Sequence, residues 1–225
     1  WLESAARLGI GTTTPSWNLQ IASSSGATIT LTDTSASANS KHWSISSIGG
    51  NFFIGTSSDN LTSTSSYLSF DSVNYNTNIG GNAGIYETND PSTSQYNTFI
   101  GYQSGHGPNS WISDFNTAIG ARSLYSATTG YSNTSIGYKS LYNNVDGDQN
   151  IAIGYNVGPN IVNGSNNILI GSNINAQNDN GMLLNIGNII FGNNIDGFID
   201  TISSGNIGIG SSSPFARFSV SGNAG

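Results

Sequence analysis

Residues 116–120 read Asn-Thr-Ala-Ile-Gly, and the pattern returns as Asn-Thr-Ser-Ile-Gly at 133–137, Asn-Ile-Ala-Ile-Gly at 150–154 and Asn-Ile-Leu-Ile-Gly at 167–171. Two further copies occupy 76–80 and 97–101. The six glycines stand at 80, 101, 120, 137, 154 and 171, so their spacing becomes constant along the chain. A repeat that converges on one period organises the fold, so it is interpreted before any single element.

A unit of about 17 residues is too short for a pair of helices and predicts one coil of a β-solenoid, with two short strands and two turns. Stacking places equivalent residues about 4.8 Å apart, in columns along the axis. We expect the Ile column inside, the Gly column at a tight corner with positive φ, and the Asn column at a corner, hydrogen-bonded to an amide of the next coil. The structural repeat residues are Asn97, Ile100, Gly101, Asn116, Ile119, Gly120, Asn133, Ile136, Gly137, Asn150, Ile153, Gly154, Asn167, Ile170 and Gly171.

Period-two alternation after each glycine predicts which residues face inward. A polar column that includes Arg122 and Lys139 is expected outside. Its neighbours, a Tyr column and a Ser/Val column, are expected on the Ile side or at a subunit interface. The Tyr column consists of Tyr102, Tyr138 and Tyr155. Looser copies of the repeat lie at 51–55 and 188–192.

The two ends of the chain match each other at a constant offset, which places residue 207 in correspondence with residue 8. Residues 8–21 and 207–220 each contain a short Gly-Ile-Gly strand, a polar turn closed by Pro, and an alternating strand. We therefore predict an N-terminal β-rich connector module at 1–75, the β-roll repeats at 76–192, and a C-terminal connector with the start of a next module at 193–225. Alternating runs between residues 22 and 75 predict antiparallel strands with exposed Thr faces.

Composition excludes several classes of protein. Asn, Ser, Thr and Gly make up about half of the 225 residues, 8% are charged, the net charge is −7 and Cys is absent. Five scattered cations cannot form a nucleic-acid-binding face. Without Cys there is no disulfide framework and no thiolate metal site. We expect no cofactor, no metal and no membrane contact from this segment, which we interpret as a piece of a longer polypeptide.

Small coils with few large apolar residues are poorly stabilised alone. We therefore predict a homotrimer, with three chains packed around one axis so that their remaining Ile, Tyr and Val faces are buried.

The repeats resemble the head repeats of trimeric autotransporter adhesins, which carry a similar Ser/Asn-x-Ala-Ile-Gly-x-x-Ser pattern. Residues 116–124 and 133–141 match it well, although the repeat period of this chain exceeds that of the family. The resemblance implies a left-handed parallel β-roll in an intertwined trimer. The Gly-Ile-Gly-Thr-Thr-x-Pro element, at 9–15, is similar to one in bacteriophage tail fibres.

Catalytic residues are poorly supported. His42 and His106 lie in unrelated segments without metal-ligand spacing. Asp146-Gly147-Asp148 lacks the Glu that completes a calcium loop, so a solvated turn is favoured. Asp196 and Asp200 could flank a glycosidic bond, but nothing places them on one face.

Sugar binding is the more plausible chemistry, because aromatic rings stack on sugars. Tyr125 and Tyr142 occupy equivalent positions near a coil corner, and Trp111 lies in a longer insert of the kind that often forms a binding loop. These three are the ligand-contact candidates. Packing of the same aromatics is the alternative interpretation.

The sequence thus predicts an all-β chain, a parallel β-solenoid between β-rich connectors. Its expected function is structural and adhesive: a non-enzymatic segment of an extracellular trimeric fibre, either a surface adhesin or a phage tail fibre. Partners would be the chain itself and a cell-surface glycan or protein receptor, with no nucleic acid. The alternative is a tailspike-like glycan hydrolase or lyase built on a solenoid.

Overall fold

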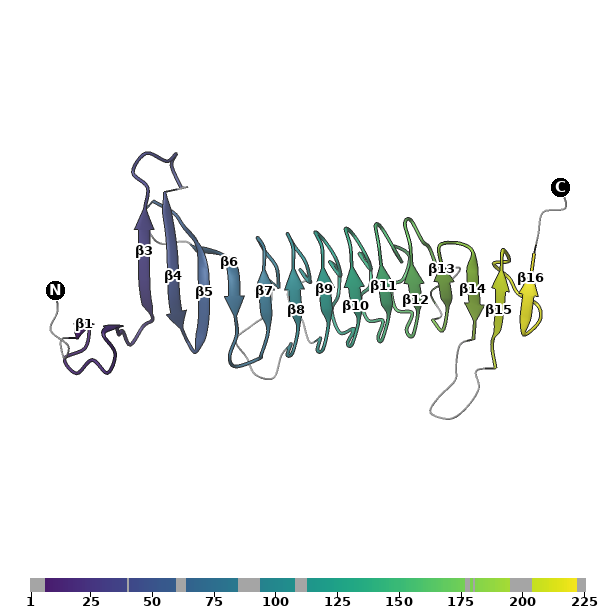
Figure 1. Ribbon diagram of the computed structural model, residues 1–225, viewed down its shortest axis with the longest axis horizontal. Helices are drawn as coiled ribbons and strands as arrows, with labels where there is room; N and C mark the ends of the chain where they lie inside the picture. The colour runs from purple at the N-terminus through teal and green to yellow at the C-terminus, as the bar shows by residue number, and fades with distance from the viewer. Residues whose placement is uncertain are drawn as a thin grey trace. The chain divides into compact units, whose positions relative to one another are not determined.

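The computed structural model describes residues 7–39, 41–59, 64–84, 94–107, 113–176, 179, 181–194 and 204–221 (Figure 1). The chain divides into two compact units, residues 1–73 and 74–225. The described residues form sixteen strands and no helix, which confirms the all-β class.

The first unit contains a strand pair and a four-stranded meander. Strands β1 (Leu8–Ile10) and β2 (Leu19–Ile21) pair in parallel. The antiparallel meander consists of β3 (Ala27–Thr32), β4 (His42–Ile48), β5 (Asn51–Ser57) and β6 (Thr64–Phe70). These strands confirm the antiparallel prediction. The loose repeat copy at 51–55, however, belongs to β5 and is not a solenoid coil, because its neighbours are antiparallel strands.

The second unit is a β-solenoid in which each coil contributes one short strand to a parallel sheet. The strands are β7 (Thr77–Ile79), β8 (Thr98–Ile100), β9 (Thr117–Ile119), β10 (Thr134–Ile136), β11 (Ile151–Ile153), β12 (Ile168–Ile170) and β13 (Leu184–Ile186). Neighbouring strands join equivalent repeat positions, so Thr117 pairs with Thr134 and Ile119 with Ile136. The register therefore confirms the predicted parallel solenoid, with one strand for each of the six copies of the repeat and a seventh, β13, where the chain has no copy.

The prediction of two strands per coil is wrong for the described coils. After each strand the chain passes through residues in the left-handed region, such as Arg122 and Leu124 with φ of 56° and 51°. A left-handed residue interrupts the extended backbone that a strand needs. Neighbouring coils still bond there, as when the Leu124 N–H donates to Ser140 O at 2.9 Å.

The expected position of the Ile column is also wrong. In the strands from β8 to β13 the buried residue is the one before Ile, as at Phe99, Ala118 and Leu169, each 0% exposed. The Ile residues are half-buried or, at Ile79, exposed, and they face away from the core. The reason is the buried Asn that precedes each strand from β7 to β12, because alternation turns the second residue after it inward and the third outward. The predicted inward Ser/Val column is correct, since Ser104, Ser123, Ser140, Val157 and Ile174 are buried.

The Asn column forms a buried hydrogen-bonded ladder, as predicted. Asn116 Oδ1 accepts the N–H of Asn133 at 2.8 Å, and Asn133 Oδ1 accepts the N–H of Asn150 at 2.9 Å. The Asn133 Nδ2 group also donates to Gly147 O at 2.8 Å. The left-handed residue of this corner is the one before each Asn, such as Phe115 with φ of 59°. Each Asn thus satisfies backbone groups that would otherwise be buried without partners.

The Gly column also has its predicted role. Gly120 has φ of 124°, and a Cβ there would lie 2.6 Å from the carbonyl carbon of Gly137 in the next coil. Only glycine meets both conditions.

Antiparallel strands end the solenoid. β14 (Ile190–Asn193) reverses direction against β13, β15 (Asn206–Ile209) is antiparallel to β14, and β16 (Phe218–Val220) is parallel to β15. The loose repeat copy at 188–192 is therefore a turn and an antiparallel strand, not a coil, because the chain reverses after β13. Strands of the predicted C-terminal connector continue the sheet of the second unit.

Candidate functional site

Two of the predicted ligand-contact residues lie in one stack of rings on the solenoid. His106, Tyr125 and Tyr142 occupy equivalent positions of three successive coils. Ring centroids are 4.7 Å apart for His106 and Tyr125 and 4.9 Å apart for Tyr125 and Tyr142, with interplanar angles of 10° and 3°. The backbone aligns them, since the Gly107 N–H donates to Tyr125 O and the Ser126 N–H donates to Tyr142 O. We call this set the His106 ladder.

The His106 ladder changes what its tyrosines can bind. Tyr125 has His106 against one face and Tyr142 against the other, so neither face is free to stack on a sugar ring. Lys139 Nζ lies 5.4 Å from the centroid of the Tyr142 ring and 5.5 Å from that of Tyr138, within cation–π range. What the ladder presents to a partner is therefore ring edges beside a positive charge. Trp111, the third candidate, lies outside the described residues.

The ionisation of His106 fits its place in the stack. Partial burial lowers the pKa of the imidazole, and the hydrogen bond of the Gly107 backbone opposes that shift with a smaller effect. The ring is therefore neutral at pH 7 and stacks on Tyr125 without the cost of a buried charge.

A second ladder, which the sequence analysis missed, is the more exposed one. Tyr75, Tyr96 and Phe115 stack with centroids 5.3 Å and 5.1 Å apart and interplanar angles of 1° and 4°. Their side chains are 63%, 48% and 57% exposed. Each residue directly precedes an Asn of the buried ladder, and that position was the available signal. We call this set the Tyr96 ladder.

The Tyr column, expected inward or at a subunit interface, is not buried inside the coil and is exposed in the single chain. Tyr102, Tyr138 and Tyr155 are 52%, 41% and 54% exposed. They follow the corner glycine, where the backbone turns away from the core, so strand alternation does not extend to them. Tyr138 and Tyr155 stack with centroids 5.6 Å apart.

The acidic residues of the solenoid bind neighbouring coils. Asp146 accepts the hydroxyl of Thr129 at 2.7 Å, and Asp148 accepts the backbone N–H of Tyr131 at 3.0 Å. Asp179 Oδ1 accepts the N–H groups of both Val162 and Gly164. Like the Asn ladder, these carboxylates accept hydrogen bonds from the neighbouring coil, but they do so at the outer turns. Asp196 and Asp200 lie outside the described residues.

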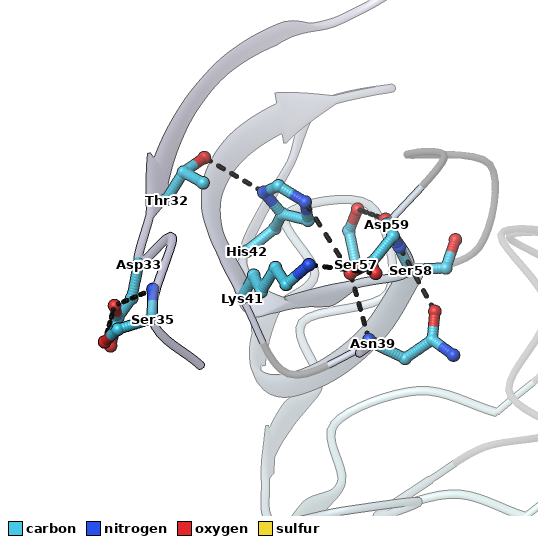
Figure 2. Close-up of polar contacts among 9 residues, drawn as sticks. All are labelled: Thr32, Asp33, Ser35, Asn39, Lys41, His42, Ser57, Ser58 and Asp59. Carbon is cyan, nitrogen blue, oxygen red and sulfur yellow. Dashed lines mark hydrogen bonds and ion pairs between the residues drawn. The ribbon is translucent and has the colours of Figure 1, made fainter. Parts of the chain in front are cut away.

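A polar cluster at the ends of β3, β4 and β5 contains the second histidine (Figure 2). His42 Nδ1 lies 2.9 Å from the Thr32 hydroxyl, and its Nε2 lies 3.9 Å from Asp59. Lys41 Nζ is 3.4 Å from Asp59, which also accepts the Asn39 N–H at 2.9 Å. That N–H, and secondarily Lys41 and His42, lower the pKa of Asp59. The cluster fastens the β3–β4 connection to the end of β5.

Within the described ranges no three His, Asp or Glu side chains group in a way that could hold a metal ion. In the same ranges no helix is long and apolar enough for a membrane span. Comparison with protein-family models, curated proteins and solved structures finds no match to this chain.

Proposed function

We propose that the chain is a structural and adhesive segment of a homotrimeric extracellular fibre, either a cell-surface adhesin or a phage tail fibre. The observation that carries the proposal is the outer face of the sheet β7–β13. Its Ile column runs through every coil, from Ile79 to Ile186, and remains half-buried or exposed in the single chain. A continuous apolar face of this kind marks an association surface.

The partners that best match this apolar face are further copies of the same chain. The columns repeat at the spacing of neighbouring strands, about 4.8 Å, so identical chains in parallel bring Ile next to Ile in every coil. The adjacent outward column supports this, because it changes from Thr117 and Thr134 to Ile151 and Ile168 along the axis. Three copies around one axis turn the apolar face of each chain to the centre, in closed symmetry.

The proposed mechanism is rigid display. The buried Asn ladder and stacked glycines fix the spacing of the coils, and a trimer presents the His106 and Tyr96 ladders three times. Repeated weak contacts with a glycan or protein receptor would then add through effective concentration. The acids Asp146, Asp148 and Asp179 bond to neighbouring coils, which favours this structural role over the glycan hydrolase alternative. Release of reducing sugar from bacterial polysaccharides would support that alternative.

Sedimentation equilibrium on the full chain tests the proposal. We expect a mass three times that of the chain. Ile136→Lys should dissociate the trimer while the far-UV circular dichroism is kept, because Ile136 faces away from the core. Asn163→Lys, at an exposed turn on a different side of the coil, is the matched control and should remain trimeric. A monomeric wild-type chain contradicts the proposal.

A further inference from the structure

The two end motifs of the chain are built with the same register. β1 pairs with β2 through Leu8 with Leu19 and Ile10 with Ile21. β15 pairs with β16 through Ile207 with Phe218 and Ile209 with Val220. In both motifs the paired strands are parallel and the same length of chain separates the paired positions.

The hydrogen bonds that close the motifs also correspond. The Leu8 N–H donates to Asn18 O at 2.8 Å, and its equivalent, the Ile207 N–H, donates to Arg217 O at 3.0 Å. Gly11 and Gly210 have φ of 77° and 69°, and a Cβ on either would collide with the carbonyl oxygen that follows the second strand. The two motifs are therefore one structural unit used twice.

The motifs differ in what covers the other edge of the first strand. β14 covers β15, with Ile190 opposite Ile209 and Phe191 opposite Gly208. The Gly210 N–H also donates to Ile189 O at 2.7 Å. Among the described residues β1 pairs with β2 alone. Within the described ranges the edge that β14 occupies on β15 is thus open on β1, where Leu8 and Ile10 are 51% and 52% exposed.

We propose that the open edge of β1 binds an antiparallel strand of the β14 type, supplied by an equivalent module that precedes it in a longer polypeptide. Residues corresponding to Ile190 and Phe191 would lie opposite Ile10 and Gly9, and the Gly11 N–H would donate to the carbonyl corresponding to Ile189. The glycine in this register is required by its own turn in both motifs, since a Cβ at Gly9 or Gly208 would lie 2.5 Å from the carbonyl oxygen of Thr12 or Ser211. The proposal rests on the fibre function above, because successive modules supply the strand.

An open, regular strand edge needs such a partner. Unpaired backbone groups on an apolar edge are templates for strand addition and aggregation. In the C-terminal motif the same polypeptide supplies the strand, so each module would end by covering the edge of the next. The constant offset between the two motifs then becomes the length of one module.

A tandem chain tests the proposal. Residues 1–206 joined directly to residues 8–225 place Leu8 in the position of Ile207, after β14 and the connection that leads to β15. Hydrogen exchange is followed by mass spectrometry in peptides that span the junction, which are unique to the tandem chain. Exchange at Leu8–Gly11 should be at least about tenfold slower at the junction than at the N-terminus of the single chain, because backbone pairing protects amides. Equal exchange at the two places overturns the proposal.

A matched control carries Phe191→Pro in the first module of the tandem chain. It should restore fast exchange at the junction and leave the peptides around Asn133 protected. If the tandem chain misfolds, the test uses the single chain with an added synthetic peptide of residues 188–194. Unchanged exchange at Leu8–Gly11 in the presence of the peptide then overturns the proposal. Concentration-dependent protection of this edge without peptide would mean that a second copy covers it, which also overturns the proposal. Mass measurement reports the trimer separately, so either proposal can fail alone.

Discussion

The solenoid and the meander are both β structures, but they are stabilised in different ways. The solenoid encloses a core in which Phe99, Leu141 and Leu169 are 0% exposed, and its buried Asn residues bond to the backbone of the next coil. The meander is a single layer, in which Leu31 and Trp43 are 62% and 47% exposed. Stacked coils therefore create an interior that one twisted sheet cannot create alone.

The largest loss of stability is expected from substitution of a glycine whose backbone contacts the glycine of the next coil. Gly137→Ala places a Cβ against the carbonyl of Gly154 at φ of 125°, and should destabilise the solenoid by about 3–5 kcal/mol. Gly49→Ala in the meander has φ of 59° but no atom within 4 Å of the new Cβ, and should cost only about 1–2 kcal/mol. Chemical denaturation of both variants measures the difference. Equal losses would mean that coil contact does not set the glycine requirement.

The next effect concerns the buried Asn ladder. Asn133→Leu removes the acceptor of the Asn150 N–H and the donor to Gly147 O. Leaving these groups buried without partners should cost about 2–4 kcal/mol. Asn163→Leu, at an exposed turn, is the control and should change the free energy of unfolding by less than about 0.5 kcal/mol. An Asn133→Leu variant as stable as the wild type would show that the hydrogen bonds of the Asn ladder do not contribute to the free energy of unfolding.

Much of this arrangement was predictable, and the exceptions have a physical cause. The Asn hydrogen-bond ladder and the Gly corners could be predicted from the sequence, since each residue recurs once, at the same position, in every copy of the repeat. The prediction from hydrophobicity that Ile119 and its equivalents lie in the core was wrong. Polar Asn116 occupies the core, and strand alternation then turns Ile119 outward. The Tyr96 ladder was missed because Asn76, Asn97 and Asn116 do not share the constant spacing of the later copies. The position before each Asn marks these three residues in the sequence, but whether their rings stack depends on the geometry of neighbouring coils.

Dilution should affect the two regions differently. Because the meander has no interior of its own, its β3–β6 amides should exchange several-fold faster below the concentration at which chains dissociate. Peptides of β10–β12 should change less, since their core lies within each chain. Hydrogen exchange at two protein concentrations makes the comparison. Uniform acceleration would indicate that the solenoid also depends on association for its fold.

The smallest expected effect is on acidification. The pKa of Asp59 is lowered below 3.8, chiefly by the Asn39 N–H, so its contribution to stability is present above pH 3.8 and is lost as pH falls through the lowered value. Exchange in residues 41–59 should therefore rise at acid pH before that in residues 133–154. Asp59→Asn should remove much of this pH dependence, and an unchanged profile would exclude Asp59 as its cause.

The proposed trimer requires the outward Ile columns of three chains to meet. The protein has no Cys, so Ile153→Cys gives one spin-label position on that face, and Asn163→Cys gives one on an outer turn. Double electron–electron resonance on the assembled protein should give a single short interchain distance at position 153 and a longer one at position 163. Absence of interchain coupling at 153, or a distance there as long as at 163, would contradict the trimer built on this face.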